Sequence, residues 1–344
     1  MSPQPTSFRV PWHALLVAAL TLGLLWWFFH NLNFGEVWRA IASARLTLVG
    51  AAVLVTIMTY IVRAWRWQAL LAPIGHARFR NAFRTTVIGF TATFLLPGRL
   101  GEVLRPYLLA RAEGFNTASA FATVIIERVM DLASVVLLFA WLLVTAELDV
   151  GRDVKIAGAM SGALAVVAVG LLIASAGHPE RLGRWAGQLA RVLPAGARDA
   201  VTRFVHRFAE GLAVMRRPGP LVAAFALSLL LWLSINLGIW LTSRAFDLTF
   251  SFVSSFLVVM FLVVGVSVPT PGGVGGFHKM YQFAVTTFFG AAAEVAAACA
   301  IVLHAVSFVP ISILGLFFMA QDGLTLGRLR SLKSTAQAES ELEG

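Results

Sequence analysis

The stretch PTPGGVGGF at residues 269–277 places two prolines and four glycines between two apolar segments. SFVSSFLVVMFLVVGVSV precedes it at 251–268, and HKMYQFAVTTFFG follows it at 278–290. In lipid, each backbone N–H or C=O without a hydrogen-bond partner costs several kcal/mol. A broken helix is therefore tolerated at membrane depth only where protein covers the break or where the break lines a cavity. We expect this stretch to form the tip of a re-entrant hairpin.

Composition indicates the class of protein that contains this tip. Of the 344 residues, 58% are hydrophobic and 13% are charged, whereas a soluble protein has about 25% charged residues. The sequence therefore predicts an all-α polytopic membrane protein. Its net charge of +10 is explained by basic cytoplasmic loops, so no nucleic-acid partner is expected. The one cysteine, Cys299, excludes an intramolecular disulfide, and no metal or cofactor site is expected.

Hydropathy predicts about six spanning helices and two segments broken by Pro and Gly. The broken segments are 83–110 and 250–289, and the spanning helices are expected at 12–30, 46–64, 117–146, 154–176, 218–242 and 293–320. Residues 1–325 are expected to form a single transmembrane domain. Within it, residues 178–217 have the pattern of amphipathic helices in the membrane interface, or packed on the membrane domain itself. Residues 326–344 are expected to be a disordered cytoplasmic tail.

The charges of the loops predict which side of the membrane each segment faces. The loop 63–84 carries five Arg and no acid, and the insert 178–217 and the tail are also basic, so all three are expected to be cytoplasmic. The loop 147–155 has more acids than bases and is expected outside. The segment 83–110 then begins and ends inside, whereas 250–289 begins and ends outside. Two oppositely oriented re-entrant hairpins follow, with both chain termini cytoplasmic.

The two hairpin tips also resemble each other. LLPGRLGEVLRPY at 95–107 aligns with PTPGGVGGFHKMY at 269–281, so that Pro, Gly, Gly and Tyr coincide and Arg105 falls on Lys279. The sequence therefore predicts an inverted repeat of about 46–146 and about 218–320. Inverted repeats whose broken helices meet near the midplane are a recurring plan of transporters.

The first tip offers a chemistry suited to anions. Glycine N–H groups and a helix N-terminus favour negative charge, and the guanidinium groups of Arg99 and Arg105 suit phosphate. Glu102 could pair with either arginine or accept a proton. An Arg99–Glu102 or Glu102–Arg105 pair that only fixes the hairpin is the alternative interpretation.

Further ionisable residues lie in the helices next to the two tips. Glu127, Arg128 and Asp131 fall within about one turn of a predicted spanning helix, where charge is costly and needs partners. Substrate or proton handling and a buried structural network are both open for them. The second tip offers the N–H groups of its glycines, followed by His278 and Lys279. His304 is either a hydrogen-bonded core residue or part of the same site.

The motifs FLLPGRLGEVLRPYLL, ERVMDL and PTPGGVGGF, in this order, resemble the transmembrane region of lysylphosphatidylglycerol synthases. The resemblance covers about residues 10–325 and implies a lipid flippase of a bacterial or archaeal cytoplasmic membrane. Nothing in the chain could fold as the aminoacyl-transferase domain of the full-length synthases, so lysine transfer is not implied. The resemblance implies that the substrate-binding residues are Pro97, Gly98, Arg99, Gly101, Glu102, Arg105, Glu127, Arg128, Asp131, Pro271, Gly272, Gly273, Gly275 and Gly276. His278, Lys279 and His304 join this set from the reading of the second tip.

The sequence as a whole predicts a transporter rather than an enzyme. We expect it to move the phosphate-bearing headgroup of a phospholipid or a polyprenyl-phosphate-linked lipid across the membrane. The partners expected are the membrane lipid, the bilayer and proteins of lipid synthesis. An ion-coupled carrier of a small soluble anion and an intramembrane enzyme acting on a lipid phosphate are the alternatives.

Overall fold

A computed structural model describes residues 12–96, 99–145 and 217–324. Between these ranges it also describes residues 151–153, 156, 159, 160, 162–164, 167, 207 and 208. The secondary structure of these residues is helical, with no strand among them. The tail, the predicted insert apart from residues 207, 208 and 217, and most of the predicted helix 154–176 lie outside the described residues.

Four of the described helices are long and apolar enough to cross a membrane: α3 (Leu46–Leu71), α6 (Thr117–Thr145), α10 (Pro218–Ala245) and α13 (Ala293–Gln321). A bend of 82° joins α1 (Trp12–Phe29) to α2 (Phe34–Ser43), and the two together can count as a fifth span. The chain is thus a multi-pass membrane protein built of helices, as predicted. The sixth span and the inverted repeat stay predictions.

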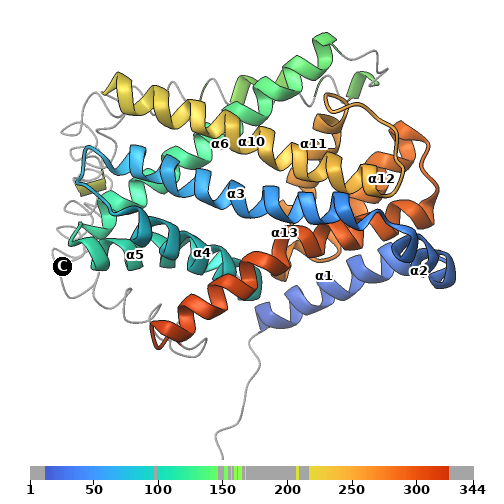
Figure 1. Ribbon diagram of the computed structural model, residues 1–344, viewed down its shortest axis with the longest axis horizontal. Helices are drawn as coiled ribbons and strands as arrows, with labels where there is room; N and C mark the ends of the chain where they lie inside the picture. The colour runs from blue at the N-terminus through green and yellow to red at the C-terminus, as the bar shows by residue number, and fades with distance from the viewer. Residues whose placement is uncertain are drawn as a thin grey trace, which may run out of the picture.

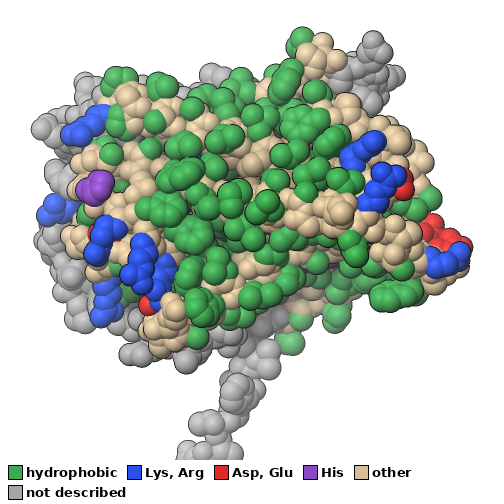
Figure 2. Space-filling view, in the orientation of Figure 1, with side chains coloured by type: hydrophobic (Ala, Val, Ile, Leu, Met, Phe, Trp, Pro, Cys, Tyr) green, Lys and Arg blue, Asp and Glu red, His purple; other side chains and the backbone are tan. Residues whose placement is uncertain are grey.

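The spans run along the long axis of the molecule, where α3 and α10 lie side by side (Figure 1). Figure 2 shows hydrophobic side chains across the middle of one face, with Lys and Arg gathered toward the two ends. Such a surface suits a protein whose middle contacts lipid tails and whose ends contact headgroups and water.

Both segments predicted as hairpins are broken into two short helices. The first consists of α4 (Phe79–Leu95) and α5 (Gly101–Glu113). The second consists of α11 (Ser255–Ser267), the single 3₁₀ turn η4 (Pro271–Gly273) and α12 (Gly276–Phe289). Figure 1 shows α4 and α5 toward one end of the molecule and α11 and α12 toward the other.

A pair of glycines lets the two arms of each hairpin come close together. A Cβ atom added to Gly89 of α4 would lie 2.7 Å from the Cβ of Arg105 and 3.0 Å from the carbonyl oxygen of Gly101. In the second hairpin, a Cβ atom on Gly265 would lie 2.6 Å from the carbonyl oxygen of Gly276. A side chain at any of these four positions would push the arms apart.

The end of α3 differs from the sequence prediction in a way that changes the functional site. The predicted helix stopped at residue 64, but α3 continues to Leu71. Arg63 and Arg66 therefore belong to a spanning helix and not to a cytoplasmic loop, and Arg66 is fully buried. The sequence alone placed Arg66 in a cytoplasmic loop, because the carboxylates that neutralise its charge lie on α6, which is distant in sequence.

Candidate functional site

A cluster of buried charges joins three helices in the interior. We call it the arginine–carboxylate cluster; it contains Arg66 of α3, Arg105 of α5, and Glu127 and Asp131 of α6. Arg105 donates from Nη1 to Oε2 of Glu127 at 2.6 Å and from Nη2 to Oε1 at 3.1 Å. This two-pronged geometry is the strongest arrangement of a guanidinium and a carboxylate. This ion pair joins α5, the helix that follows the first tip, to the spanning helix α6.

Arg66 connects both carboxylates of α6. Its Nη1 donates to Oδ1 of Asp131 at 2.5 Å, and its Nη2 lies 3.5 Å from Oε1 of Glu127. The same Nη1 donates to the hydroxyl of Ser228 on α10 at 3.1 Å. Glu127 and Asp131 can both interact with Arg66 because residues four apart lie on the same face of a helix.

Aromatic side chains enclose the cluster. The guanidinium of Arg105 lies 3.7 Å from the ring centre of Trp67, which allows a cation–π interaction. The indole N–H of Trp67 donates to Thr123 at 2.9 Å, and that of Trp232 donates to Asp131 at 3.1 Å. Both indole N–H groups therefore have a hydrogen-bond partner, as buried Trp side chains usually do.

Two more arginines lie beside the cluster. Arg128 places its Nη1 3.6 Å from Oδ2 of Asp131 and keeps 41% of its side chain exposed. Arg63 lies one turn before Arg66 and is close enough for electrostatic interaction with Asp131 and Arg128. It has no ion pair with any described residue, and its guanidinium lies 4.6 Å from the ring centre of Phe90.

The charges of this region do not cancel. Among the described residues, four guanidinium groups stand against two carboxylates, which leaves a formal excess of two positive charges. The buried Nε atoms of all four arginines also have no hydrogen-bond partner among the described residues. Uncompensated charge is costly at membrane depth, whereas an anion placed here would neutralise it. Guanidinium groups are well suited to bind phosphate.

The first tip holds the predicted residues in several different ways. Arg99 adopts a φ of +52° and donates from Nη2 to the backbone carbonyl of Val266 at 2.7 Å. Its Nη1 lies 3.8 Å from Glu102, and both side chains are partly exposed. Such a pair contributes little to stability. Arg105 binds Glu127 and not Glu102, so only one of the two alternative pairs is present, while Pro97 and Gly98 lie outside the described residues.

The second tip uses its glycines for backbone conformations that other residues rarely adopt. Gly272, Gly273 and Gly275 have φ values of +60°, +68° and +86°. The carbonyl of Gly272 is hydrogen-bonded to Nε2 of His304 at 2.9 Å. The ring of His304 stacks on that of His278, with centroids 4.6 Å apart. These two histidines therefore pack at the second tip, and both interpretations of His304, a hydrogen-bonded core residue or part of the site, stay open.

The two tips contact each other, because Arg99 of the first bonds to Val266 of the second hairpin. A Cβ atom on Gly272 would lie 3.5 Å from the carbonyl of Phe94 at the end of α4. Lys279 does not join the tips: its ammonium lies 5.0 Å from the ring centre of Trp27 on α1 and donates to Gln282. The predicted residues thus divide into the cluster, the joined tips, and Lys279 on the α1 side.

Sequence reasoning missed Arg66 of the cluster and the residues around it, namely Arg63, Trp67, Ser228 and Trp232. Arg66 was hidden by its place at the end of an apolar run, where a positive charge indicates a cytoplasmic loop. The spacing of Arg63 and Arg66, which puts both on one side of a continued helix, was the one signal available.

Comparison with known proteins adds the following relationships. The family described as lysylphosphatidylglycerol synthase TM region matches residues 13–315. The chain is similar to Glycosyltransferase AglD of Haloferax volcanii, with 27% identity over 332 residues that cover 85% of this chain. The match covers 51% of that protein, so the chain spans about half the length of this relative. A UPF0104 membrane protein of Methanothermobacter thermautotrophicus is 24% identical over 300 residues, covering 82% of this chain and 87% of that protein.

The prediction that the chain is not an enzyme is contradicted by one of these relatives. A protein that is similar over 85% of this chain has the name of an enzyme. The prediction rested on the absence of familiar catalytic motifs, and such a search says nothing of chemistry carried by an unfamiliar set of residues.

Proposed function

The chain belongs to the family of the lysylphosphatidylglycerol synthase transmembrane region, and on this premise we propose that it moves a phosphate-bearing lipid headgroup across the membrane. The lipid is a phospholipid or a polyprenyl-phosphate-linked lipid. The protein lies in the cytoplasmic membrane with both termini on the cytoplasmic side. Proteins that make or consume the lipid are its proposed partners.

The excess positive charge that Arg63 and Arg128 add beside the arginine–carboxylate cluster is the observation that carries this proposal. Arg63 has no acidic partner among the described residues, and Arg128 is held only loosely at 3.6 Å. A phosphate that binds between them would supply the missing negative charge in a water-poor site, where electrostatic attraction is strong. The aliphatic or prenyl tails would stay in the surrounding lipid, so only the headgroup would need a polar path.

The joined tips suit the role of a barrier in this pathway. They are connected by the hydrogen bond from Arg99 to Val266, and His304 holds the carbonyl of Gly272. Passage of a headgroup between the tips requires the Arg99–Val266 bond to break, because the two segments are in direct contact. A backbone carbonyl is a weaker partner for Arg99 than a phosphate would be, so an arriving headgroup can compete for it.

Lipid movement in proteoliposomes tests the proposal through Arg63. The substitution Arg63→Gln removes one positive charge without breaking an ion pair to any residue that the structure describes, so the protein should still fold. We expect wild-type protein to accelerate the transbilayer movement of fluorescent phosphatidylglycerol or of a short-chain polyprenyl phosphate. Arg63→Gln should slow this movement about tenfold, because charge-assisted hydrogen bonds contribute ~1.5–3 kcal/mol. Arg63→Lys should restore part of it.

Arg39→Gln is the matched control, since Arg39 lies on α2 with 75% of its side chain exposed. It should move lipid at the wild-type rate. Equal rates for Arg63→Gln and wild type, with equal amounts of folded protein, would contradict the proposal. Movement of soluble phosphate but of neither lipid would instead favour the carrier of a small anion.

The relative named Glycosyltransferase AglD favours a second candidate function. In it, the cluster holds the phosphate of a lipid while a glycosyl group is transferred to or from that lipid. Mass spectrometry of the lipids after incubation with a glycosyl donor separates the two functions. A lipid whose mass changes by one sugar unit indicates transfer, whereas an unchanged lipid that has changed leaflet indicates movement.

A further inference from the structure

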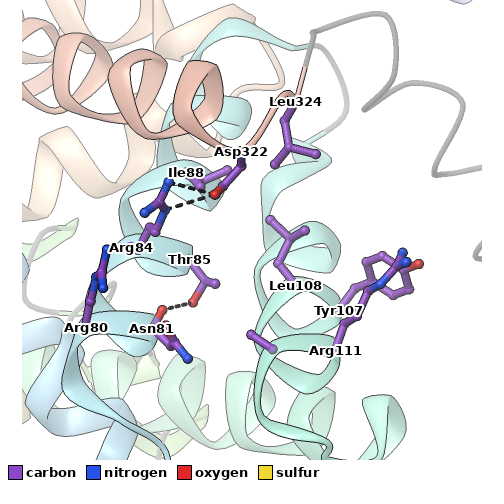
Figure 3. A pocket seen from close by; sticks show the side chains of 11 residues that line it. Arg80, Asn81, Arg84, Thr85, Ile88, Tyr107, Leu108, Arg111, Asp322 and Leu324 are labelled. Atoms are coloured by element: carbon purple, nitrogen blue, oxygen red, sulfur yellow. Dashed lines mark hydrogen bonds and ion pairs between the residues drawn. The ribbon is translucent and has the colours of Figure 1, made fainter.

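A cavity of about 520 Å³ lies between α4, α5 and the end of α13 (Figure 3). Arg80 and Arg84 of α4 lie on one side, and Tyr107 and Arg111 of α5 lie on the other. The residue that closes the cavity from α13 is Asp322, just past the helix end. None of these residues belongs to the arginine–carboxylate cluster.

Two of the three arginines of this cavity have no acidic partner among the described residues. Arg84 is held by Asp322, with Nε 3.0 Å from Oδ2 and Nη2 2.7 Å from Oδ1. Arg80 and Arg111 are exposed and form no ion pair with any residue that the structure describes. Counted over the described lining residues, three guanidinium groups and one carboxylate leave a formal excess of two positive charges at the cavity.

The rest of the lining is mixed, with polar side chains of Asn81 and Thr85 on the α4 side and apolar or aromatic side chains elsewhere. Ile88, Leu108, Ala112 and Leu324 contribute aliphatic surface, and Tyr107 contributes a ring with a hydroxyl group. A site for a free inorganic anion needs polar groups on all sides, because every oxygen of the ion seeks a hydrogen-bond donor. Cations beside aliphatic surface suit a molecule with a charged head and an apolar body.

The place of the cavity indicates which molecule of this kind is available. It lies at the end of the first hairpin, where α4 begins and α5 and α13 end, and toward one end of the long axis (Figure 1). Lipid headgroups occupy this depth in a protein whose apolar middle spans the bilayer. Clusters of Arg beside the bilayer surface attract anionic lipids.

We propose that this cavity is a docking site for the phosphate group of an anionic phospholipid. Arg80 and Arg111 bind the phosphate oxygens, and Leu108 and Ile88 contact the start of the acyl chains. The site is separate from the buried cluster. We assign it the role of an initial binding site for the transported lipid, and this role rests on the proposed function. The binding of the lipid itself does not depend on that function.

Native mass spectrometry of the whole chain in detergent tests the binding. The probes are phosphatidylglycerol, zwitterionic phosphatidylcholine and inorganic phosphate. We expect phosphatidylglycerol to bind more tightly than phosphatidylcholine. The double substitution Arg80→Gln with Arg111→Gln should weaken phosphatidylglycerol binding about tenfold or more, because each arginine supplies charge-assisted hydrogen bonds. Since both side chains are exposed and neither has an ion-pair partner in the described part of the chain, the unfolding temperature should not change.

Arg78→Gln is the matched control. Arg78 lies two residues from Arg80 with 71% of its side chain exposed, but it does not line the cavity. It should bind phosphatidylglycerol like the wild type. The docking site is refuted if the double variant binds phosphatidylglycerol as tightly as the wild type, or if Arg78→Gln weakens it equally. Displacement of the lipid by millimolar phosphate would also overturn the lipid assignment, because it would identify a site for the free anion.

The proposed function and the docking site can fail separately. Arg63→Gln should slow lipid movement about tenfold while it keeps phosphatidylglycerol binding at the cavity. The Arg80 and Arg111 variant should lose binding and slow movement only at low lipid content, where docking limits the rate. Lipid movement that is unaffected by Arg63→Gln, beside intact docking, would overturn the function and leave the docking site in place.

Discussion

Arg66 holds the middle of the molecule together at the residue scale. It contacts Asp131, Glu127 and Ser228, so one side chain links α3 to α6 and α10. Its side chain is fully buried, and so is that of Glu127. Breaking a buried pair leaves a charge without its partner, which costs much more than the pair contributes when it is intact.

We expect Arg66→Gln to destabilise the protein by about 3–5 kcal/mol, the cost of an orphaned buried charge. Asp131→Asn should also destabilise it, but by less, because Glu127 still faces Arg66. The double variant should be more stable than the sum of the two losses predicts, since neither partner is then left charged and alone. Chemical unfolding in detergent measures all three, with the exposed Arg39→Gln as control. Strict additivity would show that Arg66 and Asp131 are not coupled.

The hairpins depend on glycine at the scale of the element. Gly101 faces Gly89 across the first hairpin, and Gly276 faces Gly265 across the second. In both hairpins one glycine lies at the first turn of the arm that leaves the tip. These contacts let the backbones of the two arms pack directly against each other. Each short helix is therefore stabilised by packing against its partner, because a helix of this length is marginally stable alone.

Gly101→Ala should destabilise the first hairpin by about 1–3 kcal/mol, because the new Cβ atom overlaps the carbonyl of Gly89 and the hydroxyl of Thr93. Gly276→Ala should have a similar effect on the second hairpin. Gly50→Ala on α3 is the control, since nothing lies within 4 Å of its added Cβ atom. It should stabilise α3 by roughly 0.5–1 kcal/mol. Thermal unfolding measures these changes, and an unchanged unfolding temperature in Gly101→Ala would refute the close contact.

At the scale of the whole molecule, the two hairpins approach from opposite ends and meet at their tips. Figure 1 places them at opposite ends of the long axis, and the hydrogen bond from Arg99 to Val266 joins them. Charged residues gather toward both ends of the face in Figure 2, with an apolar middle. A bilayer around this middle would place the ends of one hairpin on one side and the ends of the other on the opposite side.

Cysteine labelling of the membrane-embedded protein tests this orientation. The buried Cys299 is the one native cysteine, so Cys299→Ser gives a cysteine-free background. His76→Cys and Thr117→Cys mark the two ends of the first hairpin, and Thr249→Cys and Ala292→Cys mark those of the second. All four positions are exposed. An impermeant maleimide should label the first pair only from the cytoplasm and the second pair only from outside, and labelling of both pairs from one side would contradict it.

The sequence by itself determined which residues could not lie in ordinary spanning helices. Pro and Gly at 97–98 and 269–275 disfavour a continuous helix, and their apolar surroundings indicate membrane depth, so both breaks were expected from local chemistry. Composition likewise determined the membrane class. Glu127 and Asp131 were recognisable as important because charge in an apolar helix is costly wherever the helix packs.

Only the tertiary structure decided which charges belong together. Arg66 and Asp131 are 65 residues apart, and Arg105 forms its ion pair with Glu127 and not with Glu102, which is nearer in sequence. Likewise, the contact of Arg99 with Val266 crosses 167 residues. The physical reason is that ion pairs depend on distances in space, which are set by how the helices pack, whereas a sequence pattern reports distances along one helix.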